Sequence, residues 1–521
     1  MKRTAAALAP ALAVALAVSA IAPLTAHAQS AAEPRLVLTP KPDPAPRING
    51  ARVFGVRPGS PFLFTIPVTG DRPMTYGVEG LPDGLVLDTA TGQITGTLAA
   101  PGATDVVFTA ANARGTTSRP FRIVCGPTLA LTPHMGWNSW YVWENRVTDA
   151  IMRSAADAMV ASGMMDHGYM YVNIDDCWSV RPESDDPGRR GEPRDARGMI
   201  NANAYFPDMK AMTDYIHAKG LKAGIYTSPG PRTCAGFTAA AGYEELDVRR
   251  FVEWGFDFLK YDWCSYGDTA DETDLDELRR PYERISGLLA AQPRDIVLNL
   301  CQYGMGRVWE WGRAVGGHSW RTAGDLGHDV VGNLFRDGFD VYSANELHRY
   351  GGPGGWNDPD YLLIGILSSA FVADRKEGGN EASPLSPNEQ YTHVSLWSLV
   401  AAPLIFSGDI TRLDDFTLGL LTNDEIIEVD QDPLGKPGRR VTKAGDLEVW
   451  ARELEDGSLA VGLFNRGEGL KAVSASWRDL GLSGPRRVRD LWRQKDVGVC
   501  DGAFEAYVAR HGVVMVRLFP I

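Results

Sequence analysis

The chain has 521 residues, which is more than one hydrophobic core organises, so its length predicts two to four domains. Its formal net charge of −13 argues against nucleic acid and anionic membrane surfaces as partners, because both repel an acidic protein. A neutral or cationic ligand is compatible with this charge.

The first 28 residues have the pattern of an export signal. Lys2 and Arg3 precede a run of Ala, Leu and Val, and residues 26–28 supply a cleavage site of the small-x-small type. No later stretch of the sequence is long and apolar enough to span a bilayer. We therefore expect export to the periplasm or the medium, with a mature chain that begins at Gln29 and is open to disulfide formation.

The outer parts of the chain have the pattern of β structure. Residues 29–48 are rich in Pro and Ala and predict a linker, and residues 49–126 consist of short alternating runs broken by turns. This spacing predicts a small immunoglobulin-like β-sandwich without a cluster of titratable groups. Alternating apolar and polar residues return over 435–521, which predicts a C-terminal antiparallel β-sandwich.

The middle of the chain, residues 127–430, alternates short apolar strands with amphipathic helices. Helices are expected at 149–164, 207–219, 244–254 and 281–291, the last with Pro281 in its first turn. Strands that alternate with helices imply a parallel sheet, and eight such units in about 300 residues predict an α/β fold of the (β/α)8 TIM-barrel type. The expected strand ends are 134–138, 171–176, 223–226, 259–262, 297–302, 318–325, 355–360 and 404–409.

One strand end differs from the rest because charged residues follow directly on an apolar run. Residues 256–264 read FDFLKYDWC, which places Lys260 and Asp262 on the same face of a strand. The ammonium group of Lys260 is expected to keep the carboxylate ionised, as a nucleophile requires. Taken alone, the segment fits a buried structural ion pair equally well.

The strand ends carry carboxylates and aromatic side chains of the kind that bind sugars. Aromatic faces pack on the C–H face of a pyranose, and carboxylates accept hydrogen bonds from its hydroxyl groups. Hydrolysis of a glycosidic bond needs two carboxyl groups and no cofactor. The sequence has neither a recognised histidine spacing for a metal nor a glycine-rich phosphate loop. The candidates at the rim are Asp175, Asp176, Asp262, Asp325 and Asp360, with Trp137, Trp178, Tyr226 and Trp356.

Five ordered motifs resemble those of one enzyme family. They are MGWNSW at 135–140, NIDDCW at 173–178, LKYDWC at 259–264, WRTAGD at 320–325 and GWNDPD at 355–360. The same order is typical of the melibiases, glycoside hydrolase family 27, which are α-galactosidases and α-N-acetylgalactosaminidases. The resemblance covers about residues 130–521, and the segment at 49–126 resembles the immunoglobulin-like modules appended to secreted bacterial enzymes.

The resemblance implies a retaining double displacement. Asp262 matches the family nucleophile and Asp325 the general acid/base. Arg321 lies four residues before Asp325, where its charge would oppose the protonation that an acid catalyst needs. We therefore expect Arg321 to face a substrate hydroxyl group instead.

Binding roles follow from the same match. Asp175 and Asp176 would bind the C4 and C6 hydroxyl groups, and an axial C4 hydroxyl distinguishes galactose from glucose. Trp137 would form the wall under the sugar ring, and Cys234 and Cys264 match a family disulfide. The further substrate contacts that the resemblance implies are Tyr226, Lys260, Gln302, Arg321 and Asp360.

The sequence as a whole predicts a secreted α-galactosidase that acts on terminal α-linked galactose, as a monomer or a homo-oligomer. Related activities stay open, namely α-N-acetylgalactosaminidase, β-L-arabinopyranosidase or isomaltodextranase. Gln302 stands where many family members place a glutamate against the C2 substituent, and Tyr361 stands where methionine is frequent. A catalytically silent sugar-binding protein is the alternative of another class, which the presence of both Asp262 and Asp325 disfavours.

Overall fold

The computed structural model describes residues 33–327, 329–372 and 379–521. The export signal expected at 1–28 and the start of the expected linker lie outside the described residues, so export stays a prediction. Within the described ranges, no helix combines the length and the apolar character needed to cross a membrane.

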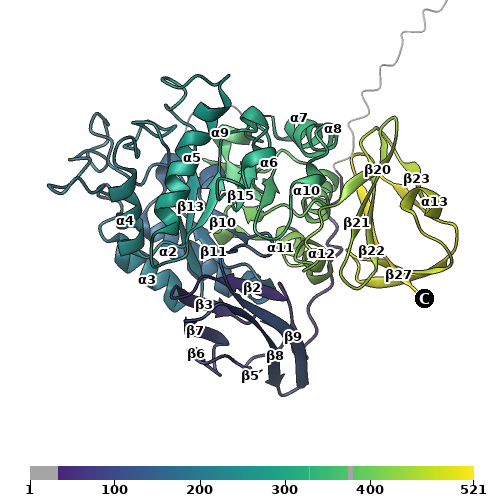
Figure 1. Cartoon of the computed structure of the whole chain (residues 1–521). Coiled ribbons are helices and arrows are strands. Elements are labelled where there is room, and N and C mark those ends of the chain that lie inside the picture. The colour runs from purple at the N-terminus through teal and green to yellow at the C-terminus, as the bar shows by residue number, and fades with distance from the viewer. Residues whose placement is uncertain (1–32, 328, 373–378) are drawn as a thin grey trace, which may run out of the picture. The chain divides into compact units, whose positions relative to one another are not determined.

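Two small sheets form the N-terminal β-rich module (Figure 1). Aromatic rings pack in its core, with the ring centres of Phe64 and Phe121 4.9 Å apart and those of Phe108 and Phe121 4.3 Å apart. The module that the sequence predicted is therefore confirmed. One sheet has the order β2 (Val53–Val56), β9 (Gly115–Cys125), β8 (Gly102–Asn112) and β5 (Thr75–Glu79), the other β3 (Pro61–Thr65), β7 (Gln93–Thr97) and β6 (Leu85–Leu87), and a short pair joins β1 (Arg47–Ile48) to β4 (Val68–Thr69).

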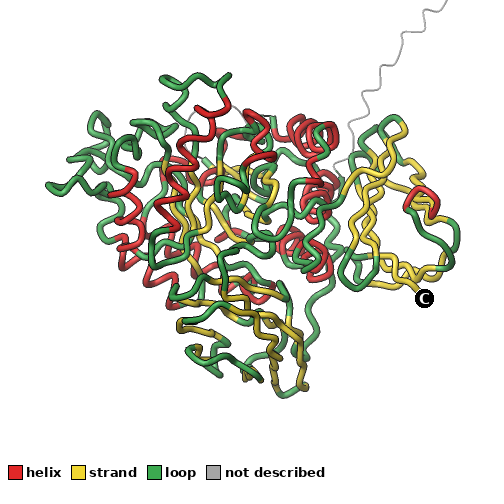
Figure 2. The backbone as a smooth tube through the Cα atoms, in the orientation of Figure 1, coloured by secondary structure: helices red, strands yellow, loops and turns green. Residues whose placement is uncertain are grey.

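The centre of the chain is a (β/α)8 barrel, as predicted (Figure 2). Its eight parallel strands run in the order β16 (Trp356–Asp358), β15 (Ser319–Arg321), β14 (Val297–Leu300), β13 (Phe258–Tyr261), β12 (Lys222–Thr227), β11 (Tyr171–Asn173), β10 (Met135–Asn138) and β19 (Leu404–Phe406). A parallel bridge between Leu362 and Phe406 closes the sheet on itself. Every strand falls at one of the eight expected strand ends, so their carboxyl ends meet at one rim.

Helices follow the barrel strands. α4 (Glu244–Trp254) has the predicted bounds, whereas α2 (Asp149–Ala161) and α3 (Met209–Ala218) are shorter than predicted. The other α-helices described in this part of the chain are α1 (Trp140–Trp143), α5 (Leu275–Ala290), α6 (Val308–Trp311), α7 (Val330–Asn333), α8 (Tyr342–Ala344), α9 (Ser369–Val372), α10 (Pro387–Leu399), α11 (Asp415–Leu421) and α12 (Asp424–Asp430). Two short strands, β17 (Ile366–Ser368) and β18 (Asn380–Ala382), pair antiparallel, and α9 follows β17 directly.

The prediction for α5 was wrong at its start. The helix begins at Leu275, because the Asp274 side chain accepts a hydrogen bond from the Asp276 amide and caps the first turn. Pro281 therefore lies inside the helix and not in its first turn. A proline inside a helix removes one main-chain hydrogen bond. The burial of apolar residues of α5, such as Tyr282, offsets this loss.

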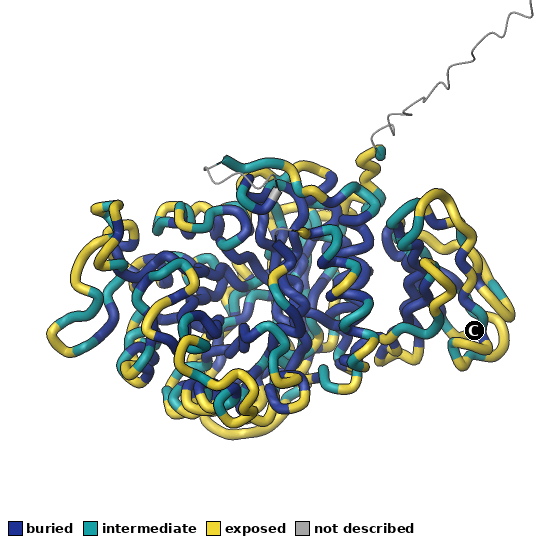
Figure 3. Tube along the Cα trace, turned by 90° about the horizontal axis from the view of Figure 1, so that it is seen from above, coloured by how far each residue is buried: buried dark blue, intermediate teal, exposed yellow. Residues whose placement is uncertain are grey.

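The C-terminal domain is antiparallel, as predicted. Its larger sheet has the order β20 (Arg439–Ala444), β21 (Leu447–Glu453), β22 (Leu459–Asn465), β27 (Val513–Pro520), β24 (Arg486–Asp490) and β25 (Lys495–Cys500), and β23 (Lys471–Ser476) pairs with β26 (Ala503–Val508) beside the short helix α13 (Trp477–Leu480). Strands β22 and β27 contact α10, in which all residues from Glu389 to Leu399 are buried (Figure 3). This contact joins the sheet to the barrel through a helix that has no solvent face.

Arg57 is one of several residues that attach the N-terminal module to the barrel. Arg57 Nε donates to Asp295 Oδ1 over 2.5 Å, just before β14. Its guanidinium group also donates to the main-chain oxygens of Ala290, Gln292 and Arg294 at the end of α5. The module is therefore attached at the amino ends of the barrel strands, away from the rim where the candidate site lies.

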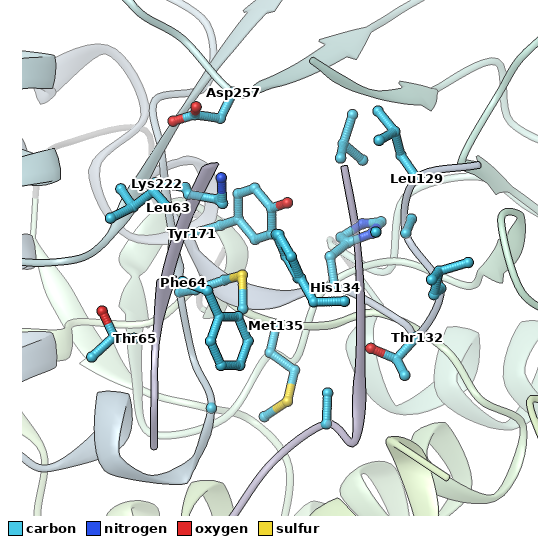
Figure 4. Close-up of a pocket in the computed structure, with 18 of the residues that line it drawn as sticks. Leu63, Phe64, Thr65, Leu129, Thr132, His134, Met135, Tyr171, Lys222 and Asp257 are labelled. Atoms are coloured by element: carbon cyan, nitrogen blue, oxygen red, sulfur yellow. The ribbon is translucent and has the colours of Figure 1, made fainter. Parts of the chain in front are cut away.

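A cavity of about 70 Å³ lies between the module and the barrel (Figure 4). Phe64 from the module and Met135, His134 and Tyr171 from the barrel line it. Lys222 reaches the same space, and its ammonium group is 5.6 Å from the ring centre of Phe54. The lining is mostly apolar, and its two carboxyl groups, those of Asp257 and Asp295, are bound by Arg294 and Arg57. This cavity therefore does not fit the expected chemistry.

Part of the expected linker is packed against the barrel. The Leu38 amide donates to the Tyr391 hydroxyl group over 3.0 Å, and that hydroxyl donates to the main-chain oxygen of Leu36 over 2.8 Å. Arg35 forms an ion pair with Asp414 at 2.8 Å. Residues 35–38 of this segment are therefore held in place by these contacts.

Candidate active site

The nucleophile candidate lies directly after β13. All four residues of this strand are buried, and Asp262 itself is only 4% exposed. Asp262 Oδ1 accepts hydrogen bonds from the Tyr303 hydroxyl group at 2.5 Å and from the Trp263 amide at 2.7 Å. The strand thus delivers one carboxylate into the barrel mouth and fixes it by one of its two oxygens.

Lys260 forms its ion pair with Asp175 and not with Asp262. Its ammonium group bonds Asp175 Oδ2 at 2.9 Å, while its charge still favours the ionised form of Asp262, as expected from the sequence. The reason for the pairing with Asp175 is the barrel geometry, in which β11 and β13 flank β12 and their carboxyl ends meet at the same rim. Burial raises the pKa of Asp262, while the charge of Lys260 and the hydrogen bonds from Tyr303 and Trp263 oppose the rise.

Arg321 also differs from its expectation. Its guanidinium nitrogen Nη2 lies 3.0 Å from Asp325 Oδ1 and 3.3 Å from Asp360 Oδ2. The side chain of Arg321 is almost completely buried, and a buried guanidinium group needs anionic or carbonyl acceptors, so it binds the nearest ones. The expectation that Arg321 faces a substrate hydroxyl group instead of Asp325 was therefore wrong.

Asp325 is the exposed member of this group. Its side chain is 47% exposed, whereas the side chain of Asp360 is 1% exposed. The charge of Asp325 contributes to the raised pKa of Asp262, so the two carboxyl groups are within electrostatic reach of each other across the mouth. A buried carboxylate and a solvent-facing one thus lie on the same rim.

Asp360 is bound by the protein from several sides. Its Oδ2 accepts hydrogen bonds from the Tyr141 hydroxyl group at 2.7 Å and the Leu326 amide at 2.8 Å. Burial raises its pKa to about 6, although the charge of Arg321 opposes this. Its backbone has φ of +95°, a conformation that costs energy for a residue with a side chain.

Asp175 and Asp176 lie together at the end of β11. Asp175 Oδ2 accepts hydrogen bonds from Lys260 and from Asn138 Nδ2, both at 2.9 Å. Asp176 accepts from the amides of Cys177 at 2.6 Å and Ala235 at 2.9 Å. Burial nevertheless raises the pKa of Asp176 to about 6, so this carboxylate is held ionised only in part at mildly acidic pH.

The predicted aromatic residues separate into two groups. Trp137 is fully buried in β10 and donates to the Gly408 main-chain oxygen over 2.8 Å. The Tyr226 hydroxyl group lies 3.5 Å from Cys264 Sγ, next to the nucleophile strand. Trp178 supports Tyr226 from behind by donating to its main-chain oxygen.

Trp356 lies outside this cluster. Its indole N–H donates over 2.8 Å to the main-chain oxygen of Ala130, a residue that precedes the first barrel strand. It begins β16, at the end of the strand opposite to the rim. The expectation that Trp356 is an aromatic residue of the rim was therefore wrong, since only the later residues of that motif reach the site.

Gln302 has an unusual environment for a buried amide. The residue is fully buried, yet neither its Nε2 nor its Oε1 has a hydrogen-bond partner within the part of the chain that the structure describes. A buried amide without partners is costly. The position of Gln302 after β14 places this unpartnered amide at the carboxyl end of a barrel strand.

Sequence reasoning missed several hydroxyl groups of the site. Tyr303, Tyr141 and Tyr361 all contact the carboxylates, the last with its hydroxyl group 3.5 Å from Asp175 Oδ2. Tyr303 follows Gln302 directly, so its place after a barrel strand was the available signal. Its left-handed backbone, with φ of +63°, could not be read from the sequence.

The disulfide between Cys234 and Cys264 is present. Their sulfur atoms and a carboxylate oxygen of Asp262 lie within 4.8 Å of one another, which resembles a metal ligand set. These residues do not fit a metal, because both cysteines are in the disulfide and offer no thiolate. Cys177 and Cys301 are buried thiols.

Comparisons with known proteins agree with this geometry. The family described as α-galactosidase A matches residues 132–432, the α-galactosidase C-terminal β-sandwich domain matches 444–518, and an Ig domain family matches 45–126. α-Galactosidase 2 of Arabidopsis thaliana is 37% identical over 76% of this chain and 92% of its own length. α-Galactosidase A of Cellvibrio japonicus is 34% identical over 75% of this chain and 93% of its own length.

Solved structures show the same relationship. A Bacteroides fragilis structure, provisionally assigned as an α-galactosidase/melibiase, has a TM-score of 0.81 and 34% identity, and the match covers 93% of this chain and 99% of that one. α-Galactosidase I of Mortierella vinacea has a TM-score of 0.63 and 29% identity over 75% of this chain and 97% of its own. The relatives and the barrel define the class: this protein is a glycoside hydrolase. Within that class, the chain belongs to the α-galactosidase family of melibiases, glycoside hydrolase family 27.

Proposed function

We propose that the protein is an exported, retaining α-galactosidase that releases terminal α-linked galactose from oligosaccharides, galactomannan-type side chains or glycoconjugates. One observation carries the proposal. Asp262 is buried at the barrel mouth with both of its accepted hydrogen bonds on Oδ1, and it lies within electrostatic reach of the exposed carboxyl group of Asp325. A retaining glycosidase needs one fixed nucleophile and one carboxyl group that exchanges protons with solvent.

The first half-reaction uses the carboxylate of Asp262 as nucleophile. Its oxygen forms a bond to the anomeric carbon while the bond from that carbon to the leaving oxygen breaks. Protonated Asp325 gives its proton to the departing oxygen. The negative charge of Asp262 is lost as the glycosyl ester forms.

The second half-reaction reverses the roles. A water oxygen bonds to the anomeric carbon, its proton passes to Asp325, and the bond to Asp262 breaks. Loss of the Asp262 charge in the intermediate removes a repulsion from Asp325, which helps Asp325 to stay ionised as a base. Two displacements at one carbon retain its configuration.

Selectivity for galactose is assigned to the carboxylates after β11. In this proposal Asp175 and Asp176 accept hydrogen bonds from the C4 and C6 hydroxyl groups. Lys260 and Asn138 fix Asp175, and two main-chain amides fix Asp176, which supports the assignment. L-Arabinopyranose lacks the C6 hydroxyl group, so the second carboxylate favours galactose. Gln302 is assigned to the C2 hydroxyl group, where its unpartnered amide supplies both a donor and an acceptor.

A panel of aryl glycosides tests the proposal: the α-galactoside, the α-N-acetylgalactosaminide and the β-L-arabinopyranoside, each with wild type and Asp262→Asn. We expect hydrolysis of the α-galactoside, lost in the variant, and release of α-galactose as the first product seen by NMR. Preference for either other glycoside would replace the proposed substrate. Full activity of the variant, or a β-configured product, would refute the nucleophile or the retaining mechanism.

A further inference from the structure

The two oxygens of the Asp262 carboxylate have different environments. Oδ1 receives the Tyr303 hydroxyl group at 2.5 Å and the Trp263 amide at 2.7 Å. Among the described residues, no hydrogen bond is donated to Oδ2. One oxygen is therefore held by the protein, and the other is left to react.

Backbone conformation and the disulfide together fix Tyr303. Tyr303 and Gly304 both have left-handed backbones, with φ of +63° and +83°. A Cβ at Gly304 would lie 2.4 Å from the main-chain oxygen of Thr322, so only glycine allows this close turn. The Tyr303 hydroxyl group also lies 3.7 Å from Cys234 Sγ and 3.8 Å from Cys264 Sγ.

The Tyr303 hydroxyl group stays protonated, so it can always donate a hydrogen bond to Asp262. Burial and the negative charge of Asp262 raise the pKa of Tyr303 far above its ordinary value, so the hydroxyl group keeps its proton across the working range. Its hydrogen bond in turn opposes the rise that burial causes in the pKa of Asp262. The pair therefore helps to keep the nucleophile ionised in a buried place.

We propose that Tyr303 is a positioning residue for the nucleophile: it holds Asp262 by Oδ1, directs Oδ2 to the anomeric carbon, and stabilises the carboxylate as it leaves the sugar. The inference rests on the retaining mechanism proposed above. When Oδ2 bonds to the anomeric carbon and the leaving oxygen departs, the carboxylate loses its charge and the Tyr303 bond weakens. When water replaces Oδ2 and gives its proton to Asp325, the charge returns to Asp262 and the bond strengthens.

Because the charge returns to Asp262 in the second half-reaction, Tyr303 should matter more for that step than for the first. With an aryl α-galactoside that has a good leaving group, Tyr303→Phe should lower kcat about tenfold and lower KM with it, because the glycosyl-enzyme accumulates. kcat/KM should fall less. The acid limb of kcat/KM should move up by about one pH unit, because the free carboxylate loses a hydrogen bond.

Tyr282→Phe is the matched control. The Tyr282 hydroxyl group donates to the main-chain oxygen of the same Asp262 over 3.3 Å, so the change removes a hydrogen bond near the nucleophile without touching its carboxylate. We expect a lower Tm with an unchanged acid limb and an unchanged ratio of kcat to kcat/KM. An equal shift of the limb in both variants would overturn the assignment to Tyr303.

A second substitution keeps the size of the ring. A fluorinated tyrosine at position 303 has a more acidic hydroxyl group and donates more strongly, so it should move the acid limb downward, opposite to Tyr303→Phe. An unmoved limb in both position-303 variants sinks the positioning role while the retaining mechanism stands. A wild-type enzyme that inverts configuration sinks the proposed function first.

Discussion

Strand β13 carries a buried aspartate at each end, and the two are treated in opposite ways. Asp257, before the strand, lies 2.8 Å from His217 Nε2 and accepts hydrogen bonds from Arg294 at 2.8 Å and from the Ala223 amide at 3.0 Å. Its pKa is lowered despite burial, chiefly by the charge of Lys222 and the bond from His217. Asp262, after the strand, has a raised pKa.

The difference shows what a carboxylate of each kind requires. The carboxylate of Asp257 is bound by cations and donors on both oxygens, which stabilises the fold and leaves nothing to react. Among the described residues, Asp262 receives hydrogen bonds on Oδ1 alone, so burial acts against its ionised form. The amino ends of the strands thus serve stability and the carboxyl ends serve chemistry, within one four-residue strand.

The largest expected effect comes from removing the carboxylate charge of Asp262, which follows β13. Asp262→Asn should lower kcat on an aryl α-galactoside by about 10⁴-fold, the scale seen when one member of a catalytic set is removed. Its Tm should stay the same or rise, because a buried carboxylate with a raised pKa destabilises the ionised fold at neutral pH. A large fall in Tm would show that Asp262 is a structural residue like Asp257.

The equivalent substitution at Asp257, before β13, should change the stability of the fold and not catalysis. Asp257→Asn leaves Arg294 and Lys222 without their anion and should lower the free energy of unfolding by about 3–5 kcal/mol in denaturant titrations. Because the pKa of Asp257 is lowered, its stabilisation is present above pH about 4 and is lost only as the pH falls through the lower folded value. The fraction that remains folded should keep wild-type kcat, and a catalytic defect there would end the comparison.

A smaller effect is expected at the carboxylate pair after β11. Asp176→Asn should weaken inhibition by free galactose by about 10- to 100-fold, the range for a hydrogen bond to a charged group. In wild type, galactose affinity should fall as the pH drops below about 6, where Asp176 takes up a proton. That part of the pH dependence should vanish in the variant, while Asp360, which also titrates near 6, continues to contribute.

The stability of wild type and Asp176→Asn should also differ with pH in a defined direction. The folded pKa of Asp176 is raised, so protonation favours the fold: its contribution is fully present below its ordinary pKa of 3.8 and is lost as the pH rises through about 6. The Tm difference between variant and wild type should therefore grow in favour of the variant from pH 4 to 7. A constant difference would mean that Asp176 is not buried as described.

The smallest effect is expected at the module contact. Arg57→Ala should lower the free energy of unfolding by about 2 kcal/mol and speed proteolysis of the N-terminal module, because a guanidinium group bonded to a carboxylate and three main-chain oxygens is lost. Activity on the aryl α-galactoside should not change. Arg122→Ala, which removes an exposed pair with Asp105 on the same module, is the control and should leave proteolysis unchanged.

Much of this architecture could be read from the chain because its signals are local. The eight barrel strands are short apolar runs with polar ends, and such runs predict buried parallel strands whatever surrounds them. The resemblance placed Asp262, Asp325, Asp175 and Asp176, and the structure brings these residues to one rim.

The sequence could not predict which side chains from different barrel strands form ion pairs and hydrogen bonds with one another. Lys260 is two residues from Asp262 in sequence, yet it bonds Asp175, which follows a strand two places away in the sheet. Arg321 divides its charge between Asp325 and Asp360, which depends on how two strand ends meet. The Tyr303 contact needs a left-handed turn that composition does not reveal.

The attachment of the N-terminal module limits which domains could replace it. Arg57 binds carbonyl groups at and just after the end of α5, and Phe54 and Phe64 line the cavity between the module and the barrel. A barrel cut free of the module would present unbound carbonyl groups and an apolar surface to water. A replacement module from another enzyme would therefore have to bring its own arginine to that spot.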